Sequence, residues 1–277
     1  MSHGDKAAIF QMLHREPGTF VIPNPWDRGS ARMLANLGFK ALATTSAGFD
    51  FACARQEGTS TFAEVLAHCR ELVEATDLPV SADLESCYAE TTEGVTETIR
   101  LAAGTGLAGC SIEDVNVFEA GSYADMPIYD IDVAAERVAA AAEAARTLGR
   151  PFTLTARAEN YLHDRPDLAD TIKRLQAYQE AGADVLYAPG PKTGADIRSI
   201  VTSVDRPVNV IAGLPGMALS VADLAELGVK RISLGSNLYR TAFGAVLGGA
   251  REILEHGTFS YTAGAATFKE IAQLYDH

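Results

Sequence analysis

The stretch Pro79-Val80-Ser81-Ala82-Asp83-Leu84-Glu85 decides the fold, because it has the pattern of a short strand that ends in two carboxylates. Side chains alternate along a strand, so Ser81, Asp83 and Glu85 are expected to share one face. Two acids on a buried face cost free energy unless positive charge lies against them. A divalent cation is the simplest such charge, and the alternative is a strand that ends in a solvated acidic loop.

Strand-like and helix-like segments alternate on both sides of this stretch. The predicted strands are 19–23, 40–44, 79–83, 107–112, 152–156, 184–187, 207–211 and 230–234. The predicted helices are 24–38, 61–75, 92–103, 132–148, 167–181, 194–203, 218–227, 237–256 and a final one at 261–275. Eight strand–helix units predict an α/β protein, a (β/α)8 TIM barrel with an extra C-terminal helix. A doubly wound open sheet is the alternative, but no Gly-x-Gly-x-x-Gly follows the first strand.

Length and composition narrow the class of protein. The 277 residues fit one barrel domain over 1–277, with a helical tail from about residue 258. A formal charge of −13 argues against nucleic acid as a partner. No apolar run reaches the roughly 20 residues of a membrane span, and the N-terminus lacks a signal-peptide core. The 4 cysteines lack Cys-x-x-Cys spacing, which favours a reducing cytoplasm over disulfides or zinc.

In a barrel of this type, chemistry takes place where the strands end at their carboxyl sides. Asp83 and Glu85 end the third predicted strand, Glu113 ends the fourth and Arg157 follows the fifth. Alternation turns Glu113, Arg157 and Asn209 toward the barrel axis. Oxygen ligands without histidine or thiolate favour Mg²⁺ or Mn²⁺, and a planar guanidinium suits a substrate carboxylate. These features predict a small anionic ligand, such as a 2-keto acid, that chelates the metal.

The same residues also have purely structural explanations. Arg157 could form an ion pair with Glu85 or Glu113. Asn209 could be a hydrogen-bonded core amide, and Ser46, after the second strand, could cap the next helix.

In combination and order, several pieces of the chain resemble the isocitrate lyase/phosphoenolpyruvate mutase superfamily. They are Pro23-Asn24-Pro25-Trp26-Asp27, Thr44-Thr45-Ser46-Ala47-Gly48, Ala82-Asp83-Leu84-Glu85, Ile112-Glu113-Asp114, Thr155-Ala156-Arg157, Asn209-Val210 and Ser233-Leu234-Gly235. The resemblance implies a (β/α)8 barrel that binds Mg²⁺ and makes or breaks C–C or P–C bonds beside a 2-keto carboxylate, through an enolate. It also implies a homo-oligomer, a dimer or tetramer, whose last helix is exchanged between neighbours.

The resemblance implies roles for three groups of residues. The implied metal shell is Asp83 as direct ligand with Glu85, Glu113 and Glu57. The implied substrate-binding residues are Trp26, Ser46, Ala47, Gly48, Asp83, Arg157 and Asn209. The implied catalytic residues are Arg157, Glu113 and Ser46.

Departures from the family pattern shape the functional hypothesis. The Lys-Lys-Cys-Gly-His loop of isocitrate and methylisocitrate lyases is replaced by Asp114-Val115-Asn116-Val117-Phe118-Glu119, and the mutase's gating-loop lysine is missing. The leading hypothesis is a Mg²⁺-dependent lyase that cleaves a C–C bond beside the keto or hydroxy group of a small 2-keto or 2-hydroxy dicarboxylate resembling oxaloacetate. The alternatives are a P–C bond enzyme acting on phosphonopyruvate or phosphoenolpyruvate, and a non-catalytic keto-acid-binding homologue.

Three further features of the sequence have possible functional roles. Tyr123 or Tyr129, in the 113–130 connection, could donate a proton. Lys192, after the sixth strand, could form a Schiff base as in an aldolase. The glycines of 212–216 and 235–236 could hold a phosphate, although turn positions explain them better.

Overall fold

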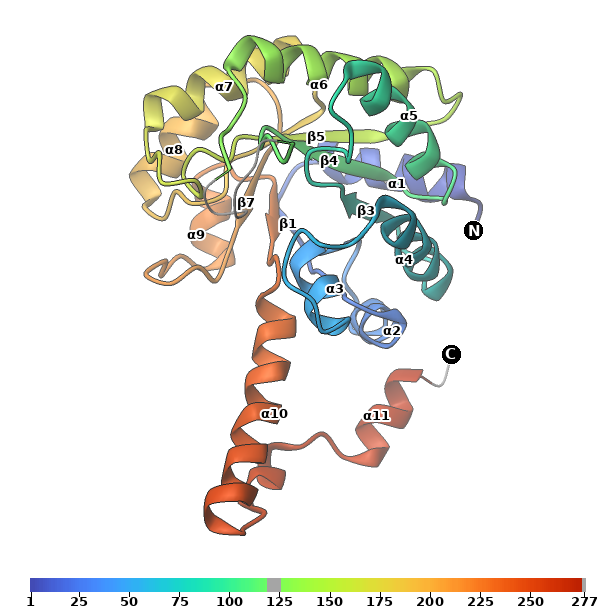
Figure 1. The fold of residues 1–277 in the computed structure, drawn as a ribbon, viewed down its shortest axis with the longest axis vertical. Helices are drawn as coiled ribbons and strands as arrows, with labels where there is room; N and C mark the ends of the chain where they lie inside the picture. Colours follow the sequence, from blue (N-terminus) through green and yellow to red (C-terminus); the bar gives the residue numbers. More distant parts are fainter. Residues whose placement is uncertain (119–125, 276–277) are drawn as a thin grey trace.

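A (β/α)8 barrel is confirmed by the computed structural model, which describes residues 1–118 and 126–275 (Figure 1). Eight parallel strands pair in the order β1-β8-β7-β6-β5-β4-β3-β2. The strands are β1 (Phe20–Ile22), β2 (Leu42–Ala43), β3 (Val80–Asp83), β4 (Gly109–Glu113), β5 (Thr153–Arg157), β6 (Val185–Tyr187), β7 (Val208–Ile211) and β8 (Arg231–Ser233). The two edge strands meet where the Ala43 N–H donates a 3.0 Å hydrogen bond to the Pro23 carbonyl.

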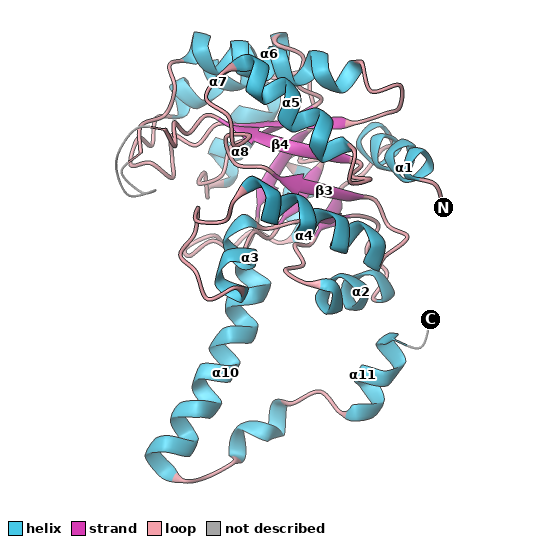
Figure 2. Cartoon of the chain, turned by 45° about the vertical axis from the view of Figure 1, so that its right-hand side comes forward, coloured by secondary structure: helices cyan, strands magenta, loops and turns pink. Residues whose placement is uncertain are grey.

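Helices surround the strands on the outside (Figure 2). They are α2 (Arg28–Asn36), α4 (Phe62–Ala75), α5 (Thr92–Ala103), α6 (Ile131–Arg146), α7 (Leu168–Glu180), α8 (Gly194–Thr202) and α9 (Val221–Glu226). Thr61 and Ser220 start α4 and α9 with capping boxes, which satisfy backbone N–H groups at the helix ends. Leu72, Ile99 and Leu154 are fully buried in the main core between helices and strands.

Helix α1 (His3–Arg15), which the sequence analysis did not predict, covers the amino-terminal end of the barrel. Its Ala7 and Phe10 form a separate apolar cluster with Phe20, Ile22, Ala41 and Ala108, which lie in or just before strands β1, β2 and β4. The ring of His14 meets Phe10 and Phe20 edge-on, with ring centroids 4.7 and 5.1 Å away. This packing seals the floor of the barrel.

A second unpredicted helix, α3 (Ser46–Ala52), lies directly after β2. Thr45 caps it, since its side chain accepts a hydrogen bond from the Gly48 N–H. The helix has only seven residues and carries a glycine in its first turn, so it is too short to show a helical period. The cap expected at Ser46 therefore lies one residue earlier, at Thr45.

The C-terminal segment forms an arm that projects away from the barrel (Figure 1). It consists of α10 (Asn237–His256), the 3₁₀ turn η2 (Ser260–Gly264) and α11 (Phe268–Tyr275), which returns to α2. The Tyr275 hydroxyl donates to the Gly29 carbonyl at 3.2 Å. No helix among the described residues is long and apolar enough to span a membrane. The single-domain organisation and the exchange of the last helix stay predictions.

Acid is expected to weaken the fold through His14. Burial and, to a smaller extent, the nearby charge of Arg231 lower the pKa of His14 to about 3. The unfolded chain therefore takes up this proton first, near the usual pKa of about 6.5, and stability is lost as the pH falls below that value. Between pH 6.5 and 5 the loss from this group should be about 2 kcal/mol of unfolding free energy, measured by urea denaturation.

The variant His14→Gln, which keeps a hydrogen-bond acceptor for Arg231, should lose this part of the pH dependence. His256→Gln, at an exposed position on α10, serves as the control and should keep it. Equal pH slopes in all three proteins would contradict the assignment to His14.

Candidate active site

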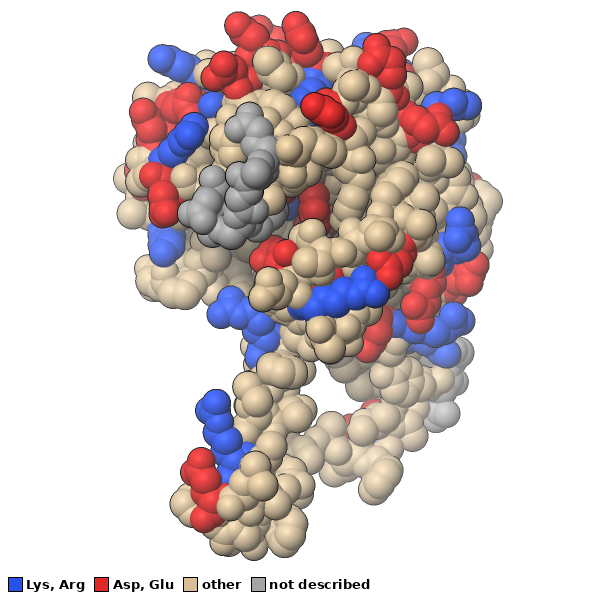
Figure 3. Space-filling view, viewed as in Figure 1, with Lys and Arg blue, Asp and Glu red and all other residues tan. Residues whose placement is uncertain are grey.

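A cavity of about 200 Å³ opens at the carboxyl ends of the strands. The last residue of every strand lines it: Ile22, Ala43, Asp83, Glu113, Arg157, Tyr187, Ile211 and Ser233. Acidic side chains are visible in the hollow on this side of the molecule (Figure 3). The barrel therefore brings residues far apart in sequence to one polar pocket, as predicted for this fold.

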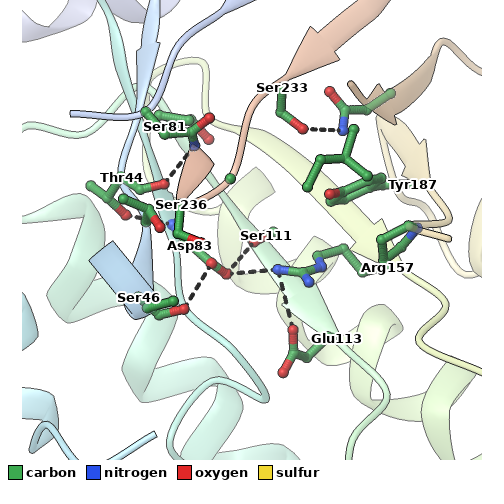
Figure 4. Close-up of a pocket in the computed structure, with 18 of the residues that line it drawn as sticks. Thr44, Ser46, Ser81, Asp83, Ser111, Glu113, Arg157, Tyr187, Ser233 and Ser236 are labelled. Atoms are coloured by element: carbon green, nitrogen blue, oxygen red, sulfur yellow. Dashed lines mark hydrogen bonds and ion pairs between the residues drawn. The ribbon is translucent and has the colours of Figure 1, made fainter. Parts of the chain in front are cut away.

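Asp83 lies at the centre of the pocket and is held by residues of β4 and of the segment that follows β2 (Figure 4). Its Oδ2 accepts a hydrogen bond from Ser46 Oγ at 3.1 Å, and its Oδ1 accepts one from Ser111 Oγ at 3.3 Å. Its backbone N–H donates to Thr44 Oγ1 at 2.8 Å. These contacts fix the direction of the carboxylate into the cavity.

Arg157 bridges the acids of three successive strand ends. Its Nη1 is 3.0 Å from Asp83 Oδ1 and 3.2 Å from Glu113 Oε2. Its Nε donates to Glu159 Oε1 at 2.8 Å, and its guanidinium lies 5.0 Å from the ring centre of Tyr187. The ion pair with Glu113 that the sequence left open is therefore present, and Asp83 and Glu159 take the place of the alternative partner Glu85.

The pKa values of the buried acids in this cluster are raised above their usual values. Burial raises the pKa of Glu159 to about 7 and that of Glu85 to about 8, with the charge of Asp83 also contributing. Burial likewise raises the pKa of Glu113 well above its usual value. Although burial alone would lower the pKa of Arg157, Glu159, Glu113 and Asp83 raise it well above the usual value. Several acids are thus crowded around Arg157, and their pKa values rise because burial and mutual repulsion disfavour their charged forms.

Glu159 is a residue of this cluster that the sequence analysis missed. It is fully buried, and its backbone N–H donates to Asp114 Oδ1 at 2.8 Å. Asp114 in turn accepts hydrogen bonds from Arg174 Nη1 at 3.0 Å and from the Tyr178 hydroxyl at 2.6 Å. Glu159 follows Arg157, the last residue of β5, by two residues, but alternation is a dependable guide only within a strand and so did not single it out.

The structure brings most of the predicted site residues together. The predicted residues that line the cavity are Ser46, Ala47, Glu57, Asp83, Glu113, Arg157 and Asn209. Glu57 is an exposed residue of the rim, in a loop that Asp50 holds by accepting hydrogen bonds from Gly58, Thr59 and Ser60. Tyr187 and Arg231 also line the cavity and were not singled out from the sequence.

Three predicted residues lie outside the cavity lining. Glu85 follows the end of β3 with a φ of +47°, so the chain leaves the strand and the alternation that placed Glu85 beside Asp83 ends. The Gly48 N–H is used by Thr45, and Trp26 packs edge-on against Tyr239 of α10 at 5.5 Å. The metal and substrate roles assigned to these three residues stay predictions.

The structure also places the residues of the other hypotheses. Lys192 is exposed and lies outside the cavity, among whose described lining residues there is no lysine. Gly213 and Gly216 have φ values of +80° and +83°, as turn glycines do, while Gly235 lines the cavity. Tyr129 stacks against Arg137 at 4.7 Å, and Tyr123 lies outside the described residues.

The oxygen ligands of the pocket fit a hard cation in chemical type. Among residues 1–118 and 126–275, no three His, Cys, Asp or Glu side chains are grouped as a complete metal site. Mg²⁺ often takes only one or two protein carboxylates and keeps several waters, so it needs no such group. The carboxylates of Asp83 and Glu113 and the Ser46 hydroxyl are the donors suited to hold it.

Comparison with known proteins identifies the family. The sequence model of the phosphoenolpyruvate phosphomutase family matches residues 10–254. The chain belongs to this family.

Its relatives in the phosphoenolpyruvate phosphomutase family carry several names. The chain is 50% identical to a Burkholderia cenocepacia J2315 protein of known crystal structure, described provisionally as a lyase/mutase, with a TM-score of 0.93 and coverage of 99% and 97% of the two chains. It is 26% identical to the oxaloacetate decarboxylase of Pseudomonas aeruginosa PAO1, over 99% of this chain and 92% of that one. It is 27% identical to the "probable 2-methylisocitrate lyase 1" of Corynebacterium glutamicum, over 92% and 84%. The resemblance inferred from the sequence motifs is thus confirmed.

Arg157 should be essential for the stability of this phosphomutase-family barrel. Arg157→Met leaves the buried carboxylates of Glu113 and Glu159 without their cation, and removing one partner of a buried pair typically costs about 3–5 kcal/mol. Urea denaturation at pH 8 measures the loss. The control is Arg150→Met, since Arg150 is half-buried and donates to the Ala103 carbonyl outside the cavity. A loss of less than about 1 kcal/mol in Arg157→Met would contradict the assigned role.

Proposed function

We propose that this protein is a Mg²⁺-dependent lyase that cleaves the C–C bond beside the keto or hydroxy group of a small 2-keto or 2-hydroxy dicarboxylate, through an enolate. The observation that carries the proposal is the shared position of Asp83, Glu113 and Arg157 in one cavity at the carboxyl ends of the strands. Family membership supports it, because the relatives include an oxaloacetate decarboxylase and a protein named "probable 2-methylisocitrate lyase 1".

Asp83 and Glu113 would hold the cation on the side of the pocket that faces Ser46. The cation, when bound, polarises the keto oxygen and stabilises negative charge that develops there. The Ser46 hydroxyl already donates to Asp83 Oδ2, so it keeps that carboxylate oriented. The positive charge of Arg157 offsets part of the negative charge of the acids. This reduces the repulsion between the pocket and an anionic substrate.

The substrate carboxylate is proposed to lie against the start of α3. The first N–H groups of a helix have no partner within the helix, and Ser46 and Ala47 occupy these positions beside the cavity. Such donors aimed at a developing negative charge can contribute about 3 kcal/mol to catalysis. The Gly48 N–H is already bonded to Thr45 and is left out of this role.

The proposed function is tested by turnover and metal binding together. Wild-type protein with Mg²⁺ should release pyruvate-type products from oxaloacetate or from methylated malates in a coupled assay. Asp83→Asn should abolish this turnover and lower Mg²⁺ affinity at least about tenfold in calorimetry, since a carboxylate is a stronger ligand for a hard cation than an amide. Asp77→Asn, with its side chain 82% exposed on the outside of the barrel, is the matched control.

Different outcomes separate the alternatives. Unchanged Mg²⁺ affinity in Asp83→Asn would remove the proposed ligand. Turnover of phosphonopyruvate alone would identify a P–C bond enzyme. Binding of keto acids without any turnover would identify a non-catalytic homologue.

We also propose that the protein is a homo-oligomer, a dimer or tetramer, assembled through the C-terminal arm. The arm exposes large apolar side chains that one chain leaves uncovered: Phe243, Val246, Leu254, Phe259 and Phe268 are 49%, 67%, 85%, 65% and 95% exposed. On the face shown in Figure 3, most of the arm's surface is neither acidic nor basic. Exposed apolar patches of this kind mark protein interfaces.

Leu254→Glu should shift the protein toward a smaller assembly. Burying a new charge in an apolar interface is costly, so the mass measured by light scattering should fall toward the 29.4 kDa of one chain. Leu101→Glu, on the exposed side of α5 at 45% exposure, should leave the mass unchanged. A wild-type protein that is monomeric at micromolar concentration would overturn the proposal.

A further inference from the structure

A second arginine, Arg231, lines the same cavity near its floor and differs from Arg157 in its surroundings. It is the first residue of β8 and is 5% exposed. Its Nε donates to Asn209 Oδ1 at 2.8 Å and its Nη2 donates to Thr155 Oγ1 at 2.9 Å. Its Nη1 is 3.3 Å from His14 Nε2. All three partners are neutral oxygen or nitrogen acceptors.

The charge of Arg231 is therefore not balanced by the protein as that of Arg157 is. Among the described residues, Arg157 forms ion pairs with three carboxylates, whereas no Asp or Glu forms one with Arg231. A buried charge without a counter-ion is costly, and proteins that keep one generally use it. Burial lowers the pKa of Arg231 only to about 10, so the group stays charged at neutral pH.

The groups packed around Arg231 do not offset its charge. Nδ1 of His14 lies 2.8 Å from the Phe10 carbonyl, so it carries the proton and leaves Nε2 as the acceptor for Arg231. Phe10 and Phe20 close the floor beneath this pair, and Tyr187 and Ser233 border the cavity above it. An apolar, sealed floor strengthens the field of a charge that faces the cavity.

We propose that Arg231 forms an anion subsite at the floor of the cavity that receives the second carboxylate of a dicarboxylate substrate. This inference rests on the proposed function. It names the residue that distinguishes a dicarboxylate substrate from a monocarboxylate. A guanidinium has five N–H donors. Three of those of Arg231 point to acceptors on Asn209, Thr155 and His14. Two donors are left for a carboxylate.

The position of the subsite orders the substrate in the pocket. The metal-suited acids Asp83 and Glu113 lie at the strand ends, while Thr155, a partner of Arg231, lies two residues earlier on β5 than Arg157. The keto or hydroxy head of the substrate is therefore held near the mouth and its second carboxylate points inward. A substrate with one carboxylate would leave the charge of Arg231 without a counter-ion.

Binding of a matched pair of ligands tests the subsite without requiring turnover. L-malate and L-lactate share a 2-hydroxy acid head, and only malate has the second carboxylate. With Mg²⁺ present, calorimetry should show wild-type protein binding malate about tenfold or more tightly than lactate, the size expected for a hydrogen bond to a charged group. Arg231→Gln should reduce this ratio to about one and leave lactate affinity within about twofold. Arg150→Gln, outside the cavity, should keep the wild-type ratio.

A crystal structure of wild-type protein with Mg²⁺ and malate gives a test that does not depend on the folding of the variant. One malate carboxylate should lie within hydrogen-bond distance of the Arg231 guanidinium. A malate preference that survives in folded Arg231→Gln, or a second carboxylate that points to the mouth near Glu57, would overturn the subsite. Failure of both ligands to bind the wild-type protein would instead overturn the proposed function.

Discussion

The contact of one guanidinium with several buried carboxylates is the constraint on which the rest of the site depends. Asp83, Glu113 and Glu159 come from three successive strand ends or just beyond them, and each lies within 3.2 Å of an Arg157 nitrogen. Arg157 lowers the pKa values of Glu113 and Glu159, so without this cation burial would keep both acids protonated over a wider pH range. Arg157 is thus a structural group of the barrel as well as a part of its pocket.

The fold could be predicted from the sequence because strand and helix periods alternate eight times, and the pocket could be predicted because side chains alternate along each strand. Alternation placed Glu113, Arg157 and Asn209 correctly toward the axis, where all three line the cavity. It failed at Glu85, whose left-handed backbone conformation lies past the last residue of β3. A period of two residues holds only while the chain remains a strand.

Helix α1 and Arg231 were not predicted because their roles depend on contacts with residues far away in the sequence. Helix α1 acts through contacts with segments far away in sequence, such as Ala108, and its own pattern of apolar residues is weak. Arg231 follows a lysine at the start of a strand, where a basic residue is most often solvated. Only the closure of the barrel and the position of His14 show that Arg231 is buried.

The sealed floor beneath the cavity has a kinetic consequence. Because α1 and its aromatic neighbours fill the amino-terminal end, reactants and products share a single passage at the carboxyl end, as far as the described residues define it. The proposed cleavage would form two fragments in this closed-ended cavity, and the inner fragment could not pass the outer one. The two products are then released in order, and the outer fragment leaves first. Because the inner fragment leaves last, it binds the same free enzyme as the substrate and should inhibit competitively.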